Sequence, residues 1–201
     1  MSAPGIEWGC SARAIPGEDV CGDRAVVHHR GEAAVAAAVD GLGHGPEAAA
    51  AAERALDAIA DDPRHEVVDL LARCHDALAR TRGAAVSVAS LHGGSTTMTW
   101  AGVGNVEGRV VRAARGRARD ESLLLAPGVV GYELPPLRPT SVELARGDLL
   151  VLATDGVDPA FADSLDTAGS CEAIAARILE QHARPRDDSL VLVARYLGQR
   201  S

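Results

Sequence analysis

The chain has 201 residues, enough for one domain with a substantial core, and we expect a single domain over residues 1–201. Every one of its 20 basic residues is arginine, and the lack of lysine excludes Walker A loops, pyridoxal Schiff bases and Ser-Lys hydrolases. A net charge of −8 disfavours binding to nucleic acid or anionic membranes, because both depend on positive charge.

The sequence also indicates a cellular location. It contains no apolar run long enough to span a membrane, and its first residues lack the basic and apolar regions of a signal peptide. The four cysteines are scattered without a CxxC pair, which is typical of reduced thiols in a chain of this length. We therefore expect a cytoplasmic protein.

The first half of the chain predicts a strand, a hairpin and two helices. A strand over residues 6–15 is followed by apolar runs at 25–29 and 33–39 around a glycine turn, a pattern typical of a hairpin. The Ala-rich segment 46–60 has proline in its first turn and predicts a helix. A second helix is expected over about 64–82, where apolar residues recur at helical spacing.

The second half is richer in strands. Turn residues separate apolar runs that predict strands over 84–91, 96–103, 106–111, 148–154 and 189–194, with one helix over 170–182. Strands and helices do not alternate strictly along the chain. The order therefore favours an α+β layered domain with largely antiparallel sheets.

Acidic residues stand at the ends of several predicted strands. Asp23 and Asp40 lie at nearly equal distances on either side of the hairpin turn, so strand pairing brings them to the same end of the sheet. Asp155 follows one buried strand, and Asp187 and Asp188 precede another. If the strands alternate in direction, all of these acids gather at one edge.

Such a group of carboxylates predicts a metal site. Several carboxylates cannot stay ionised together unless positive charge lies among them, and no lysine is present to supply it. Oxygen ligands without Cys or His at ligand spacing favour Mg²⁺ or Mn²⁺ over zinc. The alternative is that each Asp-Gly or Asp-Asp pair only marks a turn or a helix cap. The recurrence of the pattern after buried strands favours the metal site.

The same residues carry a family resemblance. The ordered segments CGD (21–23), AVDGLGHG (38–45), GVGN (102–105), LATDGV (152–157) and DDSLVLV (187–193) resemble those of the PPM, or type 2C, metal-dependent Ser/Thr phosphatases. The resemblance covers nearly the whole chain and is closest to the bacterial sporulation and stressosome feedback phosphatases. It implies an αββα sandwich of two antiparallel sheets flanked by helices.

The resemblance also implies a two-metal site. The implied ligands of two Mn²⁺ or Mg²⁺ ions are Asp23, Asp40, the Gly41 carbonyl, Asp155 and Asp187. Asp40 would bridge both ions, and Asp188 would be an outer group or an alternative ligand to Asp187. Two such ions acidify a water that attacks the phosphorus in line, without a covalent phosphoenzyme.

The chain departs from the larger family members at two points. It has Gly104-Asn105 where they have Gly-Asp, so the acid expected to hold a third metal is missing. The family's N-terminal phosphate-binding arginine has no clear match; Arg13 and Arg24 are the nearest candidates, and surface salt bridges are the alternative role for both.

Two weaker signals each have two interpretations. His44 lies four residues after Asp40 and would either protonate the leaving serine oxygen or merely solvate the loop. A basic run would be either a solvated loop or a docking surface for an acidic partner, and it consists of Arg109, Arg112, Arg115, Arg117 and Arg119.

Together these observations predict a phosphoserine/phosphothreonine phosphatase acting on a bacterial signalling regulator. By resemblance, the substrate would be a STAS-domain protein or another stressosome component. One alternative is a catalytically silent phosphoprotein-binding module with the same fold, and another is a small-molecule phosphoester hydrolase. Retention of Asp23, Asp40, Asp155 and Asp187 favours the enzyme over the silent module.

Overall fold

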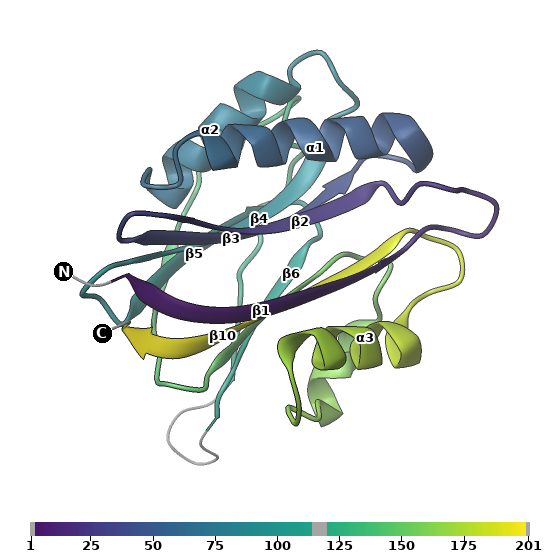
Figure 1. Cartoon of the computed structure of the whole chain (residues 1–201). Helices are drawn as coiled ribbons and strands as arrows, with labels where there is room; N and C mark the ends of the chain where they lie inside the picture. The colour runs from purple at the N-terminus through teal and green to yellow at the C-terminus, as the bar shows by residue number, and fades with distance from the viewer. Residues whose placement is uncertain (1–2, 114–119, 200–201) are drawn as a thin grey trace.

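The computed structural model describes residues 3–113 and 120–199, in which two antiparallel sheets stack face to face between layers of helix (Figure 1). The first sheet has the strand order β2 (Asp23–Arg30), β3 (Ala33–Gly41), β4 (Ala84–His92), β5 (Thr97–Val103) and β8 (Thr140–Glu143). The second has the order β1 (Pro4–Arg13), β10 (Ser189–Gln199), β9 (Leu149–Ala153), β6 (Glu107–Val111) and β7 (Glu121–Ser122). The expected αββα layering is confirmed.

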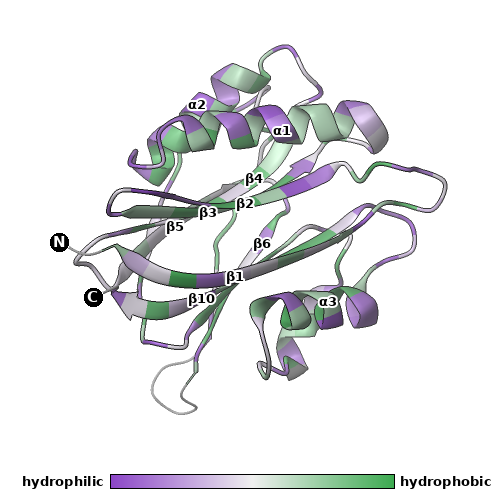
Figure 2. Cartoon of the chain, in the orientation of Figure 1, coloured by the Kyte–Doolittle hydropathy of each residue, from purple (hydrophilic) through white to green (hydrophobic). Residues whose placement is uncertain are grey.

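Helices cover the outer face of each sheet. The helices α1 (Gly45–Asp61) and α2 (Val67–Leu78) pack on the first sheet, while η1 (Pro159–Ser164) and α3 (Cys171–His182) pack on the second (Figure 1). Figure 2 shows hydrophilic residues along the outward faces of the helices and hydrophobic residues toward the sheets. In the described part of the chain, no helix combines the length and apolar character needed to cross a membrane.

Three apolar layers hold the sandwich together. The first lies between the sheets and includes Trp100, Leu152 and Leu192. A second layer joins the first sheet to α1 and α2, and a third joins the second sheet to α3 around Phe161. Because the chain has few aromatic residues, these layers consist mostly of Ala, Val and Leu side chains.

Small residues bring α1 close to β3. The buried face of α1 is largely alanine, so the helix backbone lies against the end of the strand. A Cβ atom on Gly41 would lie 2.1 Å from the carbonyl oxygen of Ala48, which no side chain could accommodate. The requirement for glycine at this position therefore places the preceding residue, Asp40, beside the start of α1.

Three short elements were not predicted from the sequence, namely β7, β8 and η1. The second helix is also shorter than expected, ending at Leu78 rather than near residue 82. The edge strands β7 and β8 are only two and four residues long, and mostly exposed, so they carry little of the apolar alternation that predicts a strand. The four cysteines are free thiols, as expected.

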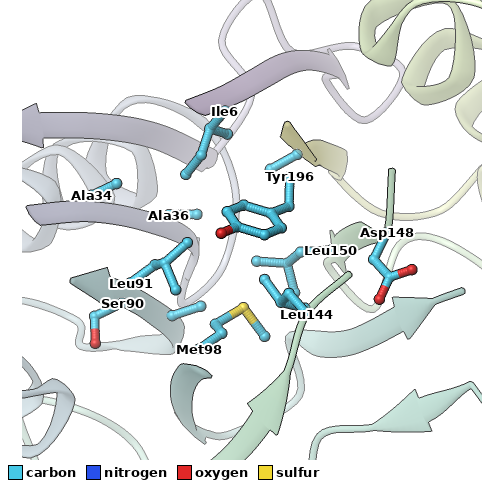
Figure 3. Close-up of a pocket in the computed structure, with 12 residues that line it drawn as sticks. Ile6, Ala34, Ala36, Ser90, Leu91, Met98, Leu144, Asp148, Leu150 and Tyr196 are labelled. Atoms are coloured by element: carbon cyan, nitrogen blue, oxygen red, sulfur yellow. The ribbon is translucent and has the colours of Figure 1, made fainter. Parts of the chain in front are cut away.

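The two ends of the sandwich differ in chemistry. At the end where the chain termini lie, a cavity of about 30 Å³ remains between the sheets (Figure 3). The ring of Tyr196 lies at its centre, near Ile6, Leu150 and Met98. This volume suits about one water molecule, and the lining is almost entirely apolar. The acidic residues lie at the opposite end, at the start of β2, at the end of β3, after β9 and before β10.

Candidate functional site

The hairpin β2–β3 brings the first two acids together. Asp23 pairs directly with Asp40 in the strand register, as the equal spacing around the turn predicts. Opposed residues on antiparallel strands have Cα atoms roughly 4.5–5.5 Å apart. Asp23 is buried and Asp40 half-buried, so both carboxyls lie largely out of water.

The second sheet supplies the next two acids. Asp155 follows β9 and Asp187 precedes β10, and these neighbouring antiparallel strands place the two residues at one end of the sheet. Asp155 is half-buried, and its Oδ2 accepts a hydrogen bond of 2.6 Å from the Asn105 amide. Asp187 is exposed.

Contacts between the sheets join the two pairs. The Thr154 hydroxyl donates to Asp23 Oδ2 at 2.7 Å, linking the end of β9 to the start of β2. Asp155 also raises the pKa of Asp40, so these two carboxyls lie within each other's electrostatic reach. Asp23, Asp40, Asp155 and Asp187 thus form one group, which we call the acid cluster.

The acid cluster is electrostatically unfavourable by itself. Burial raises the pKa of Asp40 to about 8, and repulsion from the other three members adds to the shift. Burial likewise raises the pKa of Asp23 to about 7, against the opposing hydrogen bond from Thr154. The pKa of Asp187 is raised by burial and by Asp155. The main contributors to the Asp23 and Asp40 shifts include no cationic side chain.

Asp188 lies in a different environment from Asp187. It is only 3% exposed, and its two carboxylate oxygens accept hydrogen bonds from the backbone N–H groups of Ile15 and Gly22 at 2.8 and 2.7 Å. Those residues flank the β1–β2 loop beside the acid cluster. Asp188 therefore holds the loop in place, and both of its oxygens are already engaged.

His44 lies beside the acid cluster at the N-terminus of α1. Its Nδ1 is 2.8 Å from Glu18 Oε1, and its charge acts on the pKa of Asp187. The imidazole is the N-cap residue of α1 but makes no side-chain capping bond. Glu18 is a residue that no sequence signal singled out.

The arginines near the site differ in their availability. Arg24 is committed to structure, because its guanidinium donates to Glu53 and to the backbone carbonyls of Cys21 and Asp23. Arg13 is exposed at the end of β1. Arg184, which the sequence did not indicate, donates to the Asp155 carbonyl at 2.9 Å.

Beside Asp155 lies a pocket of about 150 Å³. Arg184, Asn105 and Glu107 line it together with the end of β9. The loop after β5 and the segment after α3 meet here only in the folded protein, so the pocket could not be predicted from local sequence patterns.

The basic run is not a single solvated face. Arg112 is only 11% exposed and pairs with Asp148 at 2.8 Å and with Glu121, which corrects the expectation of a solvent-facing loop at this position. Arg109 donates to Ser122. The remaining members, Arg115, Arg117 and Arg119, lie outside the described residues.

The model of the Stage II sporulation protein E (SpoIIE) family matches residues 30–197, which is most of the chain. The chain belongs to the SpoIIE family. It is a protein phosphatase of the PPM type, in agreement with the resemblance of its motifs and with its αββα fold.

Individual relatives support this assignment. The phosphoserine phosphatase RsbX of Bacillus subtilis (strain 168) is 25% identical over 188 residues, covering 92% of this chain and 90% of that protein. A structure from a study of the bacterial stressosome as a modular system is 31% identical, covers 95% of this chain and all of that chain, and has a TM-score of 0.86. A crystal structure of RsbX with magnesium is 21% identical, covers 98% of this chain and all of that chain, and has a TM-score of 0.83.

Proposed function

We propose that the chain hydrolyses phosphoserine or phosphothreonine on a bacterial signalling protein in the cytoplasm, with two divalent cations, Mg²⁺ or Mn²⁺. The observation that carries the proposal is the acid cluster, in which four carboxyls from both sheets share one electrostatic field. A cluster without a cationic side chain among its main electrostatic partners suits a cation from outside the protein.

The donor chemistry fits hard divalent cations. All four members offer carboxylate oxygens, the ligands that Mg²⁺ and Mn²⁺ prefer. Within residues 3–113 and 120–199, no three His, Cys, Asp or Glu side chains already form a compact metal-binding group. The cluster is therefore an open set of donors rather than a finished coordination shell. Mg²⁺ commonly keeps several waters beside one or two carboxylates, so an open set is compatible with it.

The residues that would hold the cations are Asp23, Asp40, the Gly41 carbonyl, Asp155 and Asp187, the set that the family resemblance implies. Asp188 is better suited to a supporting role, since two backbone N–H groups already occupy its oxygens. When bound, the cations would lower the pKa of a water molecule and neutralise the phosphate.

Other residues orient the carboxylates of the acid cluster or would donate a proton to the leaving group. Asn105 fixes the Asp155 carboxylate, and Thr154 fixes that of Asp23. Bond cleavage leaves a negative charge on the serine oxygen, which needs a proton. His44 is a candidate donor, because Glu18 engages its Nδ1 and leaves Nε2 for the leaving group.

The relatives support a proposal for the substrate class. RsbX is a phosphoserine phosphatase, and a 31% identical structure comes from work on the stressosome. We therefore propose a phosphorylated stressosome component or another STAS-domain regulator as the substrate.

Hydrolysis of p-nitrophenyl phosphate tests the proposal. We expect activity that depends on Mn²⁺ or Mg²⁺ and is abolished by EDTA. Asp40→Asn and Asp155→Asn should each lower kcat/KM by roughly a hundredfold or more, since several kcal/mol of transition-state stabilisation depends on the metals. The control is Asp57→Asn, the same change at an exposed position of α1, which should be fully active.

Two results would contradict the proposal. Substantial turnover by Asp40→Asn, or by wild-type protein in EDTA, would remove the metal mechanism. Binding of a phosphoserine peptide by wild-type protein without hydrolysis at any metal concentration would instead favour the catalytically silent module.

A further inference from the structure

A basic groove lies on the helical face of the molecule, next to the short segment between β3 and α1. It has a volume of about 300 Å³ and runs along α1 from Glu47 to Arg54. Arg80, Thr81 and Arg82, which follow α2, form its other wall, and two alanines of α1 form its floor. We call it the arginine groove.

Two arginines of the groove have no acidic partner among the described residues. Arg54 and Arg80 are exposed, and within the described part of the chain neither guanidinium forms an ion pair or hydrogen bond. Arg82, by contrast, pairs with Glu47 across the groove. Elsewhere on the helical layer, Arg64 and Arg73 are each paired with an aspartate. Positive charge is thus concentrated in one concave place on a chain whose net charge is −8.

The groove is continuous with the loop of the acid cluster. The Nη1 atom of Arg82 lies 2.8 Å from the point that a Cβ on Gly43 would occupy. Gly43 belongs to the short segment that links Asp40 to α1. A polypeptide with its phosphoserine at the acid cluster would therefore have the arginine groove beside it.

The shape of the groove suits an extended peptide. The eight residues from Glu47 to Arg54 span about 10 Å along a helix, which equals roughly three residues of extended chain. A nucleic acid would instead bring a long row of phosphates against a predominantly acidic protein.

We propose that the arginine groove docks an acidic segment of the phosphoprotein substrate, outside the residues that bear the phosphate. Carboxylates of that segment pair with Arg54 and Arg80, and the pairing selects protein substrates with Asp or Glu near the phosphoserine. The identity of the partner rests on the proposed function, whereas the binding chemistry of the groove does not.

Binding of an unphosphorylated peptide tests the groove by itself. The probe is a fluorescein-labelled peptide with a short run of Asp and Glu, measured by fluorescence anisotropy. We expect wild-type protein to bind it and added salt to weaken the binding. Arg54→Glu/Arg80→Glu should raise Kd by about tenfold or more, because two attractions become repulsions. The milder Arg80→Gln should raise Kd less, and circular dichroism checks that both variants are folded.

The single change Arg80→Glu should also raise Kd, and its matched control is Arg146→Glu. Arg146 is exposed in the turn before β9, at the end of that strand remote from Asp155. It carries the same charge change as Arg80→Glu, so it separates a local effect from a change in net charge. Equal weakening by Arg146→Glu and Arg80→Glu, or no binding by wild-type protein, would overturn the proposal.

Kinetics with three substrates then connect the groove to catalysis. We expect Arg54→Glu/Arg80→Glu to raise KM for a phosphoserine peptide with acidic flanks. Its kinetics with p-nitrophenyl phosphate and with a neutral phosphoserine peptide should be unchanged. Equal losses on all three substrates would refute docking. If wild-type protein hydrolyses none of them, the proposed phosphatase function is wrong. The anisotropy measurement still tests whether the groove binds an acidic peptide.

Discussion

Two adjacent aspartates at the start of β10 illustrate how burial separates residues of identical chemistry. Asp187 is exposed and belongs to the acid cluster, whereas Asp188 is buried and accepts two backbone hydrogen bonds from the ends of the β1–β2 loop. Arg24 and Arg112 show the same principle, since hydrogen-bond partners commit both guanidinium groups to structure.

Substitution of Asp187 and substitution of Asp188 should therefore have opposite effects on stability and on hydrolysis. Asp188→Ala should lower the free energy of unfolding by roughly 2–4 kcal/mol, because the buried N–H of Gly22 and the half-buried N–H of Ile15 lose their acceptors. Asp187→Ala should leave stability nearly unchanged but abolish most metal-dependent hydrolysis. Urea unfolding and p-nitrophenyl phosphate turnover measure the two effects. A stable Asp188→Ala variant would contradict the assigned role.

At the scale of elements, the N-termini of two helices are built differently. The Ser170 side chain caps α3 by accepting a hydrogen bond of 3.2 Å from the Ala173 N–H. The corresponding residue of α1, His44, makes no capping bond and contacts Glu18 instead. The start of α3 thus has a structural residue at its N-cap, while α1 has a polar side chain beside the acid cluster.

Substituting these N-cap residues should separate stability from function. Ser170→Ala should cost about 1 kcal/mol of unfolding free energy and leave turnover unchanged. His44→Ala should cost about 0.5 kcal/mol or less, because it removes only an exposed ion pair. If His44 is the proton donor, its removal should lower kcat and remove the fall in kcat on the basic limb of the pH profile, where a general acid loses its proton. An unchanged profile would leave His44 as a loop residue.

At the scale of the whole molecule, the sandwich concentrates negative charge at one end. The sheets place carboxyls from β2, β3 and the end of β9 together, and repulsion among them adds to the raised pKa values of Asp23 and Asp40. The opposite end contains the termini and a small apolar cavity. The acid cluster therefore lowers the stability of the metal-free fold, and the proposed cations would offset this cost.

The stability of metal-free protein should consequently depend on pH. The pKa values of Asp23 and Asp40 rise from 3.8 to about 7 and about 8 on folding, so the folded state binds more protons than the unfolded state between these limits. The unfolding free energy in EDTA should then fall by about a few kcal/mol as the pH rises from 4 to 8.

Urea unfolding in EDTA at a series of pH values measures this dependence. Asp40→Asn should flatten the curve and be more stable than wild-type protein at pH 8, because it removes one buried charge. Added Mg²⁺ or Mn²⁺ should stabilise wild-type protein most at high pH. Stability that rises with pH throughout this range would contradict the electrostatic account of the cluster.

The amino-acid sequence was sufficient to predict the layered α+β class, most strands and helices, and the hairpin register that pairs Asp23 with Asp40. These features follow from local patterns, since apolar periodicity and turn residues act over a few neighbouring positions. The short edge strands β7 and β8 escaped prediction because sheet pairing, rather than their own sequence, stabilises them.

Only the tertiary structure distinguished the role of Asp187 from that of Asp188. Tertiary packing also places Arg112 in a buried position, and it brings Arg184 and Asn105 beside Asp155. It also separated the uncompensated Arg54 and Arg80 from arginines that are paired. The physical reason is that burial and charge pairing depend on residues far apart in the chain. A sequence shows which side chains can ionise or coordinate, but packing decides which of them keep a free oxygen or an unpaired charge.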